Sequence, residues 1–286
     1  MFAIIGIVVT IACVIGGYAA SGGHLDVLWQ PFEFIIILGA AFGSMLLGNP
    51  KDIIMGVFKK FGMIFKGPHY KKDAYVEMLS MLYAVFKLAK TKGDLALESH
   101  VEKPDESPLF QKFPGFSSDH HTRTFLCDYL RLLTLGTSNA HELESIIDGE
   151  LEAHHKHYHE ISHAVNLAAD AMPALGIVAA VLGVIHTMGS ITEPPEVLGH
   201  LIGAALVGTF TGVLVSYAFV APFARNMQMC FDSDHYYLVA IKSGLLAHMQ
   251  GYAPQVSIEF ARKILPDALR PTFQELEEVV TNLPPD

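Results

Sequence analysis

Apolar residues gather in four long stretches of the chain. Phe2–Ala20 has no charged residue, and Val27–Gly48 has one acid, Glu33. Ala171–Thr192 and Val197–Ala224 contain no Asp, Glu, Lys or Arg. About 20 mostly apolar residues suffice for a helix to cross a bilayer. The pattern predicts four transmembrane helices. The first lacks the basic start of a signal peptide, so we expect it to be retained.

The distribution of Lys and Arg predicts which segments face the cytoplasm. Of the 19 such residues, 14 lie in 49–163 and 5 in 225–286, and the two short connections between paired spans have none. We therefore expect a multi-pass protein with both termini in the cytoplasm. The expected segments are transmembrane helices 1 and 2 (1–48), a cytoplasmic domain (49–163), transmembrane helices 3 and 4 (164–224) and a cytoplasmic tail (225–286).

The cytoplasmic segments show helical periodicity. The spacing of Leu79, Leu82 and Phe86 predicts a helix over Asp73–Lys92 that ends at Gly93. Shorter helices are expected over 95–102 and 123–135, and capping boxes predict helix starts at Asn139 (with Glu142) and Thr272 (with Glu275).

The sequence predicts an all-α polytopic membrane protein with a helical cytoplasmic domain, since no segment alternates as a strand does. The helical pattern that starts at Asn139 is unbroken until Pro173. We therefore expect spans three and four to extend into long cytoplasmic helices. Residues 140–190 would reach about 75 Å as one helix.

Composition narrows the possible functions. The net charge of −10 leaves no basic face for nucleic acid. The three cysteines are isolated, which argues against a disulfide framework or a zinc ribbon. No nucleotide-binding or hydrolase motif occurs, so we expect neither an enzyme nor a cofactor.

Two prolines, and the lack of charged residues inside the spans, bear on the chemistry of the membrane part. Pro173 and Pro222 lie at the inner ends of spans three and four, where they could form paired hinges or be simply tolerated. Glu33 and Asp170 lie at span edges, and no charged residue is expected near a bilayer centre. If the chain takes part in proton conduction, a partner must therefore supply the carboxylate.

Two polar clusters lie in the cytoplasmic part. The histidines between His154 and His163 could form a metal site, but a solvated helix face is the favoured interpretation, and we expect no metal. A basic and then acidic patch surrounds Gly93, and it is either a solvated face or an electrostatic docking surface. The patch consists of Lys87, Lys90, Lys92, Glu98 and Glu102.

Four stretches together carry a family resemblance. They are GGYAASGGHLDVLWQPFEFIIILGAAFGSMLLGN (Gly16–Asn49), MPALGIVAAVLGVIHTMGS (Met172–Ser190), GTFTGVLVSYAFVAPFA (Gly208–Ala224) and GYAPQVSIEFARK (Gly251–Lys263). The chain resembles the MotA group of flagellar motor stator subunits, in the MotA/TolQ/ExbB proton channel family. The likeness covers nearly the whole chain.

The resemblance implies a place in the bacterial inner membrane and a set of partners. Five such subunits would surround two copies of a MotB-like subunit, which binds peptidoglycan and brings the proton-carrying carboxylate. Ion flow would rotate the ring, and the cytoplasmic domain would push the rotor protein FliG. The alternatives are an ExbB/TolQ-type energising subunit, which resembles a three-span design, and a non-conducting membrane scaffold.

The resemblance also implies residue roles. Pro173 and Pro222 would couple ion passage to movement of the cytoplasmic part. Thr209 would line the ion path. Ala180 stands where sodium-driven relatives have Thr, and because a methyl group cannot coordinate sodium, the likeness is to the proton-driven type.

Three charged residues match positions that contact the rotor in this family. Glu98 matches a rotor-facing acid, and Glu150 falls on another charged position. Lys90 falls where the family often has Arg, which keeps the charge but loses the bidentate guanidinium.

Overall fold

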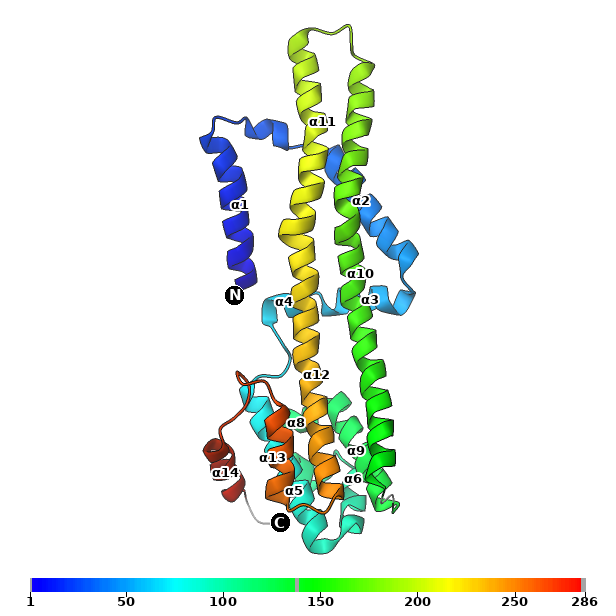
Figure 1. The fold of residues 1–286 in the computed structure, drawn as a ribbon, viewed down its shortest axis with the longest axis vertical. Helices are drawn as coiled ribbons and strands as arrows, with labels where there is room; N and C mark the ends of the chain where they lie inside the picture. Colours follow the sequence, from blue (N-terminus) through cyan, green and yellow to red (C-terminus); the bar gives the residue numbers. More distant parts are fainter. Residues whose placement is uncertain (1, 137–138, 284–286) are drawn as a thin grey trace. The chain divides into compact units, whose positions relative to one another are not determined.

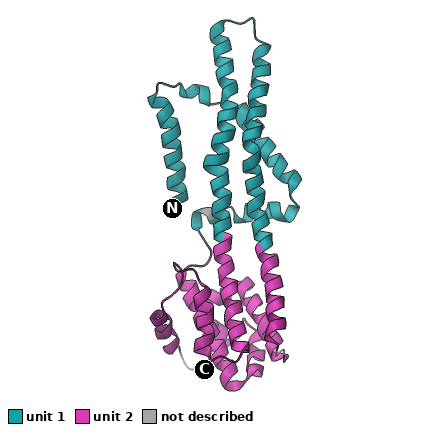
Figure 2. Ribbon diagram, in the orientation of Figure 1, with its two compact units in different colours: residues 1–67, 156–230 teal, residues 68–155, 231–286 magenta. Residues whose placement is uncertain are grey.

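The computed structural model describes residues 2–136 and 139–283, apart from the side chain of Ile64 (Figure 1). The described residues form helices and connecting loops without a strand, which confirms the all-helical prediction. The chain divides into two compact units (Figure 2). Unit 1 comprises Met1–Gly67 and Lys156–Cys230, and unit 2 comprises Pro68–His155 and Phe231–Asp286. The four-segment division by membrane side stays a prediction, because the units are defined by contacts within the chain.

Among the residues that the structure describes, four helices are long and apolar enough to cross a membrane, as the sequence predicts. The helical segments that contribute to unit 1 are α1 (Phe2–Ala20), η1 (Leu25–Leu28), α2 (Pro31–Gly48), α3 (Lys51–Lys60), α4 (Met63–Lys66), α10 (Ala140–Met188), α11 (Pro195–Val215), the π-helical η3 (Ser216–Val220) and α12 (Ala221–Met249). By their bounds, α10 and α12 also contribute to unit 2.

Helices α10 and α11 run side by side and approach closely at glycines (Figure 1). A Cβ atom on Gly176 would lie 2.8 Å from the carbonyl oxygen of Gly208 and 3.1 Å from Cα of Gly212. A Cβ atom on Gly212 would lie 2.6 Å from the carbonyl oxygen of Met172. Since these neighbours are backbone atoms, they cannot move aside as a flexible side chain can. Small residues at such a crossing allow apolar helices to pack through backbone contact.

Helices α1 and α2 bury less of their surface than α10 and α11 do. Ile37 and Ala41 of α2 pack with Met172 and Ala179 of α10. Helix α1 buries none of its residues within the chain. Apolar side chains exposed around a whole helix are typical of contact with lipid or with other subunits.

Unit 2 has a conventional hydrophobic core around α5 (Lys72–Lys92). Met78, Leu79, Leu82 and Phe86 of this helix are fully buried. The predicted end is confirmed, because Gly93 has a φ of 83° and its N–H donates to the carbonyl of Ala89. Most L-residues avoid this left-handed region, and glycine enters it freely.

Several other helices surround α5. They are η2 (Asp94–Leu97), α6 (Glu98–Glu102), α7 (Pro108–Gln111), α8 (Pro114–Ser118), α9 (His120–Thr134), α13 (Pro254–Ile264) and α14 (Phe273–Thr281). The predicted capping box of α14 is present, with Thr272 and Glu275 exchanging two hydrogen bonds. At the start of α10, the side chain of Asn139 accepts from the backbone N–H of Glu142 at 3.4 Å.

Asp119 fixes the start of α9 and ties it to the segment before α5. Its carboxylate accepts from the backbone N–H groups of His121 and Thr122 and from the hydroxyl of Tyr70. Burial alone would raise the pKa of Asp119, but these donors hold it below its ordinary value. The ring of Tyr70 stacks on Tyr237 of α12, with 3.8 Å between the centroids.

The glycine crossing makes a stability prediction. Gly176→Ala should destabilise the folded protein by about 1–3 kcal/mol, because the added methyl group meets backbone atoms of α11. Gly199→Ala is the matched control, since a Cβ atom there meets nothing within 4 Å. Thermal unfolding in detergent, followed by circular dichroism, compares the two variants. Equal stability of the two would contradict the interpretation of the crossing.

Candidate functional site

The two prolines lie beside a hydrogen bond between α10 and η3. Pro173 lies inside α10 and has no N–H to donate to the carbonyl four residues earlier, that of Ala169. The hydroxyl of Ser216 donates to this carbonyl at 2.7 Å, and Ser216 is fully buried. A side chain of η3 thus satisfies the acceptor that Pro173 leaves free in α10. Sequence reasoning missed this contact, because Ser216 and Ala169 are 47 positions apart in the chain.

The second proline follows directly after the π-helical segment. Within η3 the hydrogen bonds are wider than in an α-helix, and the N–H of Ala221 donates to the carbonyl of Ser216. Pro222 comes next and cannot donate to the carbonyl of Ala218. Single-turn π-helices inside α-helices often mark functional positions. The backbone therefore departs from α-helical hydrogen bonding near both prolines. Ser216 links the two places, because it belongs to η3 and donates to the carbonyl of Ala169 in α10.

The residues expected to line the ion path lie at the glycine crossing. A Cβ atom on Gly208 would be 3.0 Å from the backbone nitrogen of Ala180. The Cα of Thr209 lies 3.3 Å from the Cβ position of Gly176. Ala180 of α10 and Thr209 of α11 are thus brought to the same level of the helix pair. Both are half-buried.

The carboxyl group of Glu33 also reaches this crossing. A Cβ atom on Gly208 would lie 2.8 Å from Oε2 of Glu33, and one on Gly183 would lie 3.6 Å from Oε1. The sequence predicts only that Glu33 lies at the edge of span two. That prediction is incomplete, because the sequence of α2 does not indicate which other helices its first turn contacts.

Glu98 is one of the three rotor-facing candidates in unit 2. It begins α6, directly after η2, and is exposed. Within the described residues it makes no ion pair, whereas Glu102 at the end of α6 pairs with Arg131 at 2.9 Å. The Glu98 carboxylate is therefore available to a cation from outside the chain.

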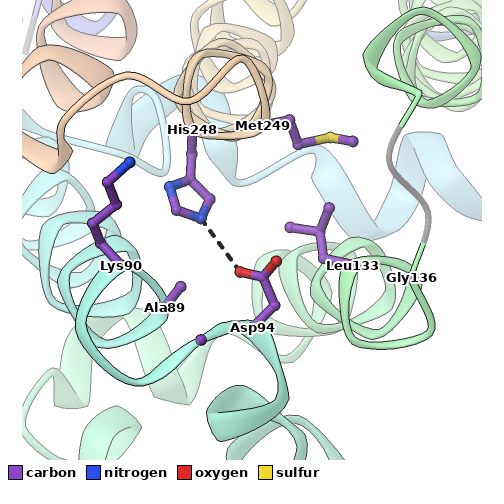
Figure 3. A pocket seen from close by; sticks show the side chains of 8 residues that line it. Ala89, Lys90, Asp94, Leu133, Gly136, His248 and Met249 are labelled. Atoms are coloured by element: carbon purple, nitrogen blue, oxygen red, sulfur yellow. Dashed lines mark ion pairs between the residues drawn. The ribbon is translucent and has the colours of Figure 1, made fainter.

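Lys90 lines a cavity of about 490 Å³ where α5, α9 and α12 end (Figure 3). Its Nζ donates to the carbonyl of Gly251 at 3.3 Å, just beyond the end of α12. A cation is favoured at the C-terminus of a helix, where the last carbonyls lack helical partners. Lys90 is exposed, so its amine is both a cap for α12 and reachable from solvent.

His248 and Asp94 face each other across the same cavity (Figure 3). Nε2 of His248 lies 3.8 Å from Oδ1 of Asp94, and the imidazole stacks on Phe86 at 4.7 Å between centroids. Burial lowers the pKa of His248, and the cation of Lys90 lowers it further, while Asp94 acts in the opposite direction. Sequence analysis missed both residues because they are distant in the chain and match no motif.

Glu150, the third candidate, is engaged inside unit 2. Its Oε2 accepts from the hydroxyl of Tyr129 at 2.5 Å, which joins α10 to α9. Tyr129 is buried, and burial together with the nearby Glu150 carboxylate raises the pKa of the phenol. A rotor contact at Glu150 would compete with this hydrogen bond.

The histidine-rich stretch forms ring contacts. In unit 2, His154 stacks on His121 at 4.8 Å between centroids, and His155 lies 4.7 Å from His235. Among residues 2–136 and 139–283, no group of three His, Cys, Asp or Glu side chains could hold a metal ion. Burial and the adjacent His155 lower the pKa of His235.

Two family descriptions match the sequence. "Motility protein A N-terminal" matches residues 4–93, and "MotA/TolQ/ExbB proton channel family" matches residues 117–235. Motility protein A of Salmonella typhimurium is 38% identical over 280 residues, which cover 98% of this chain and 95% of that protein.

Two solved structures are similar in fold. The flagellar MotAB stator complex from Bacillus subtilis matches with a TM-score of 0.71 and 26% identity, covering 90% of this chain and 92% of that chain. C. jejuni MotAB matches with a TM-score of 0.76 and 21% identity, covering 93% and 95% of the two chains. The second likeness concerns the fold alone.

The half-buried histidines His235 and His248 should make unit 2 sensitive to acid. The folded-state pKa values of His235 and His248 lie below the ordinary 6.5. The neutral imidazoles therefore contribute fully to the free energy of unfolding above pH 6.5, and this contribution is lost as the pH falls through the folded-state pKa. The melting temperature should therefore be lower at about pH 5.5 than at about pH 7.5.

The double variant His235→Gln, His248→Gln should show a smaller drop in melting temperature between these two pH values. His141→Gln is the control, because the His141 side chain is 96% exposed. A double variant with the full pH dependence of the parent protein would refute the assignment.

Proposed function

Since the chain belongs to the Motility protein A family, we propose that it is a stator subunit of the bacterial flagellar motor. The full-length likeness to Motility protein A carries this proposal. The family likeness supports insertion into the inner membrane, and the distribution of Lys and Arg supports a cytoplasmic position for both termini. The proposed assembly is a ring of five copies around two MotB-like subunits.

We propose that the complex conducts protons. The MotB-like partner would supply the proton-carrying carboxylate. Thr209 and Ala180 would line the path at the α10–α11 crossing. An alanine methyl group offers no oxygen to a dehydrated sodium ion, whereas a proton needs only water and carboxylates for its transfer. This chemistry favours protons over sodium.

The two prolines are the proposed hinges between ion passage and movement. Moving one charge across 100 mV releases about 2.3 kcal/mol. Typical conformers differ by a few kcal/mol, so a few protons are enough to bias a hinge between two states. The backbone near Pro173 and Pro222 has fewer α-helical bonds to break, and the Ser216–Ala169 hydrogen bond would change as the hinge moves. The long helices α10 and α12 would carry the movement into the cytoplasmic domain.

We propose that charged residues of unit 2 push the rotor protein FliG. Glu98 is the primary contact, because it is exposed and makes no ion pair within the described residues. Lys90 and Glu150 are further contacts, and each would exchange a partner inside the chain, Gly251 or Tyr129, for one on the rotor.

The ion assignment is tested in a motile cell that lacks its own stator subunits. Expression of this chain with its MotB-like partner should restore swimming. Swimming should continue after sodium is replaced by potassium, and it should stop when a protonophore is added. Dependence on sodium would overturn the proton assignment and keep the stator function. A failure to swim despite a purified, membrane-inserted complex would contradict the stator function, provided that a chimera with the host's own cytoplasmic domain also fails.

Glu98→Lys should abolish or severely reduce rotation, because the reversed charge repels a rotor cation. The complex should still assemble, since Glu98 supports no contact in the core. Rotation of tethered cells measures torque, and co-purification with the partner measures assembly. Glu277→Lys reverses an exposed acid on α14 and is the control. Normal torque with Glu98→Lys would contradict the rotor contact.

A further inference from the structure

Glu33 lies in an unusual environment for a carboxyl group. It is in the first turn of α2, and its oxygens reach glycines of both α10 and α11. Oε2 is buried and finds no hydrogen-bond partner among the described residues. Gly208 leaves room for this oxygen, because a Cβ atom there would lie only 2.8 Å from it.

Such a carboxyl group has two protonation states with opposing costs. A buried carboxylate without a donor is costly, whereas a proton on the oxygen removes the charge. The N-terminus of a helix favours negative charge in its first turn, by roughly 0.3–1 kcal/mol at exposed positions. Glu33 meets both conditions, since it lies in the first turn of α2 and its Oε2 is buried. These opposing effects favour a carboxyl group that binds and releases a proton over one that stays always protonated or always ionised.

The surroundings bring little other charge to this level. Residues 171–192 and 197–224 contain no Asp, Glu, Lys or Arg. His186 and His200 are exposed and lie toward the connection between α10 and α11. In the segment before α2, the titratable residues are Asp26 of η1 and His24, which precedes η1. Glu33 is thus the acid of this chain at the level of the helix crossing.

The position of Glu33 also connects it to the proposed ion path. The Cβ position of Gly208 lies 2.8 Å from Oε2 of Glu33 and 3.0 Å from the backbone nitrogen of Ala180. Thr209 is the next residue of α11. The carboxyl group therefore lies within a few ångströms of the two residues expected to line the path, on a different helix from either.

We propose that Glu33 is a second proton-binding group of the stator, in addition to the carboxylate of the partner. This rests on the proposed proton-driven function. An O–H bond forms on Oε2 as a hydronium ion on the outer side loses a proton and becomes a neutral water molecule. That bond breaks as the proton passes, directly or through water, to the carboxylate of the partner, where a new O–H bond forms. Glu33 returns to the carboxylate form.

The test uses the full chain in complex with its MotB-like partner, reconstituted into liposomes that contain a pH-sensitive dye. A potassium diffusion potential drives proton influx. Glu33→Gln keeps the size of the side chain and removes the titratable group, so influx should fall by about a hundredfold, the order typical of a positioned proton-transfer group. Glu33→Asp should retain part of the influx. Glu196→Gln is the control, because Glu196 is an exposed acid in the first turn of α11.

A second measurement addresses protonation directly. Infrared difference spectra between acidic and alkaline samples should contain the C=O stretch of a protonated carboxyl group that Glu33→Gln lacks and Glu196→Gln retains. A band that is identical in the parent complex and in Glu33→Gln would overturn the assignment.

The outcomes separate this proposal from the function on which it rests. Equal proton influx through the parent complex and Glu33→Gln would overturn the role of Glu33 and keep the proton-driven function. No influx through the parent complex would overturn the proton-driven function and the role of Glu33 with it. Loss of partner co-purification in Glu33→Gln would assign Glu33 to assembly and overturn its role in proton transfer.

Discussion

The close approach of α10 and α11 at Gly176, Gly208 and Gly212 is the constraint on which the membrane part depends. Because the two backbones meet there, only very small residues fit on the facing surfaces. The same lack of side chains leaves room for the carboxyl group of Glu33. It also brings Ala180 and Thr209 to one level. One packing rule therefore determines both the stability of the helix pair and the position of its polar groups.

Backbone hydrogen bonding imposes a second requirement in an apolar environment. Every carbonyl that a proline leaves free must find another donor or remain costly. Ser216 meets this requirement for Ala169 by donating across from η3, where the backbone has already changed to π-helical bonding. The hinge proposal gains a physical basis from this exchange, because the Ser216–Ala169 hydrogen bond that would change as the hinge moves is a hydroxyl contact worth about 1 kcal/mol.

Sequence alone predicted the features that are encoded locally. The four apolar spans, the helix predicted over Asp73–Lys92 with Gly93 at its end, and the Thr272–Glu275 cap each depend on residues within a few turns of one another. Short helices such as α7 and α8 were not predicted, because four or five residues carry too little periodicity. The contacts of Ser216, Glu33 and His248 were missed because each joins segments far apart in the chain. The roles of Pro173, Thr209 and Glu98 came from the family resemblance, which geometry supplements with neighbours and exposure.

The hydrogen bond between Tyr129 and Glu150 has a mechanical consequence. Glu150 lies on the surface, but its carboxylate is tied to a phenol that is buried among the core residues of α9. A cation that bound the Glu150 carboxylate would leave the Tyr129 hydroxyl without its acceptor and so weaken the packing of α9 against α10. The affinity of an external contact at Glu150 and the stability of the core are therefore coupled. Glu98 has no such hydrogen bond among the described residues, so a partner could bind and leave there without disturbing the packing of the domain.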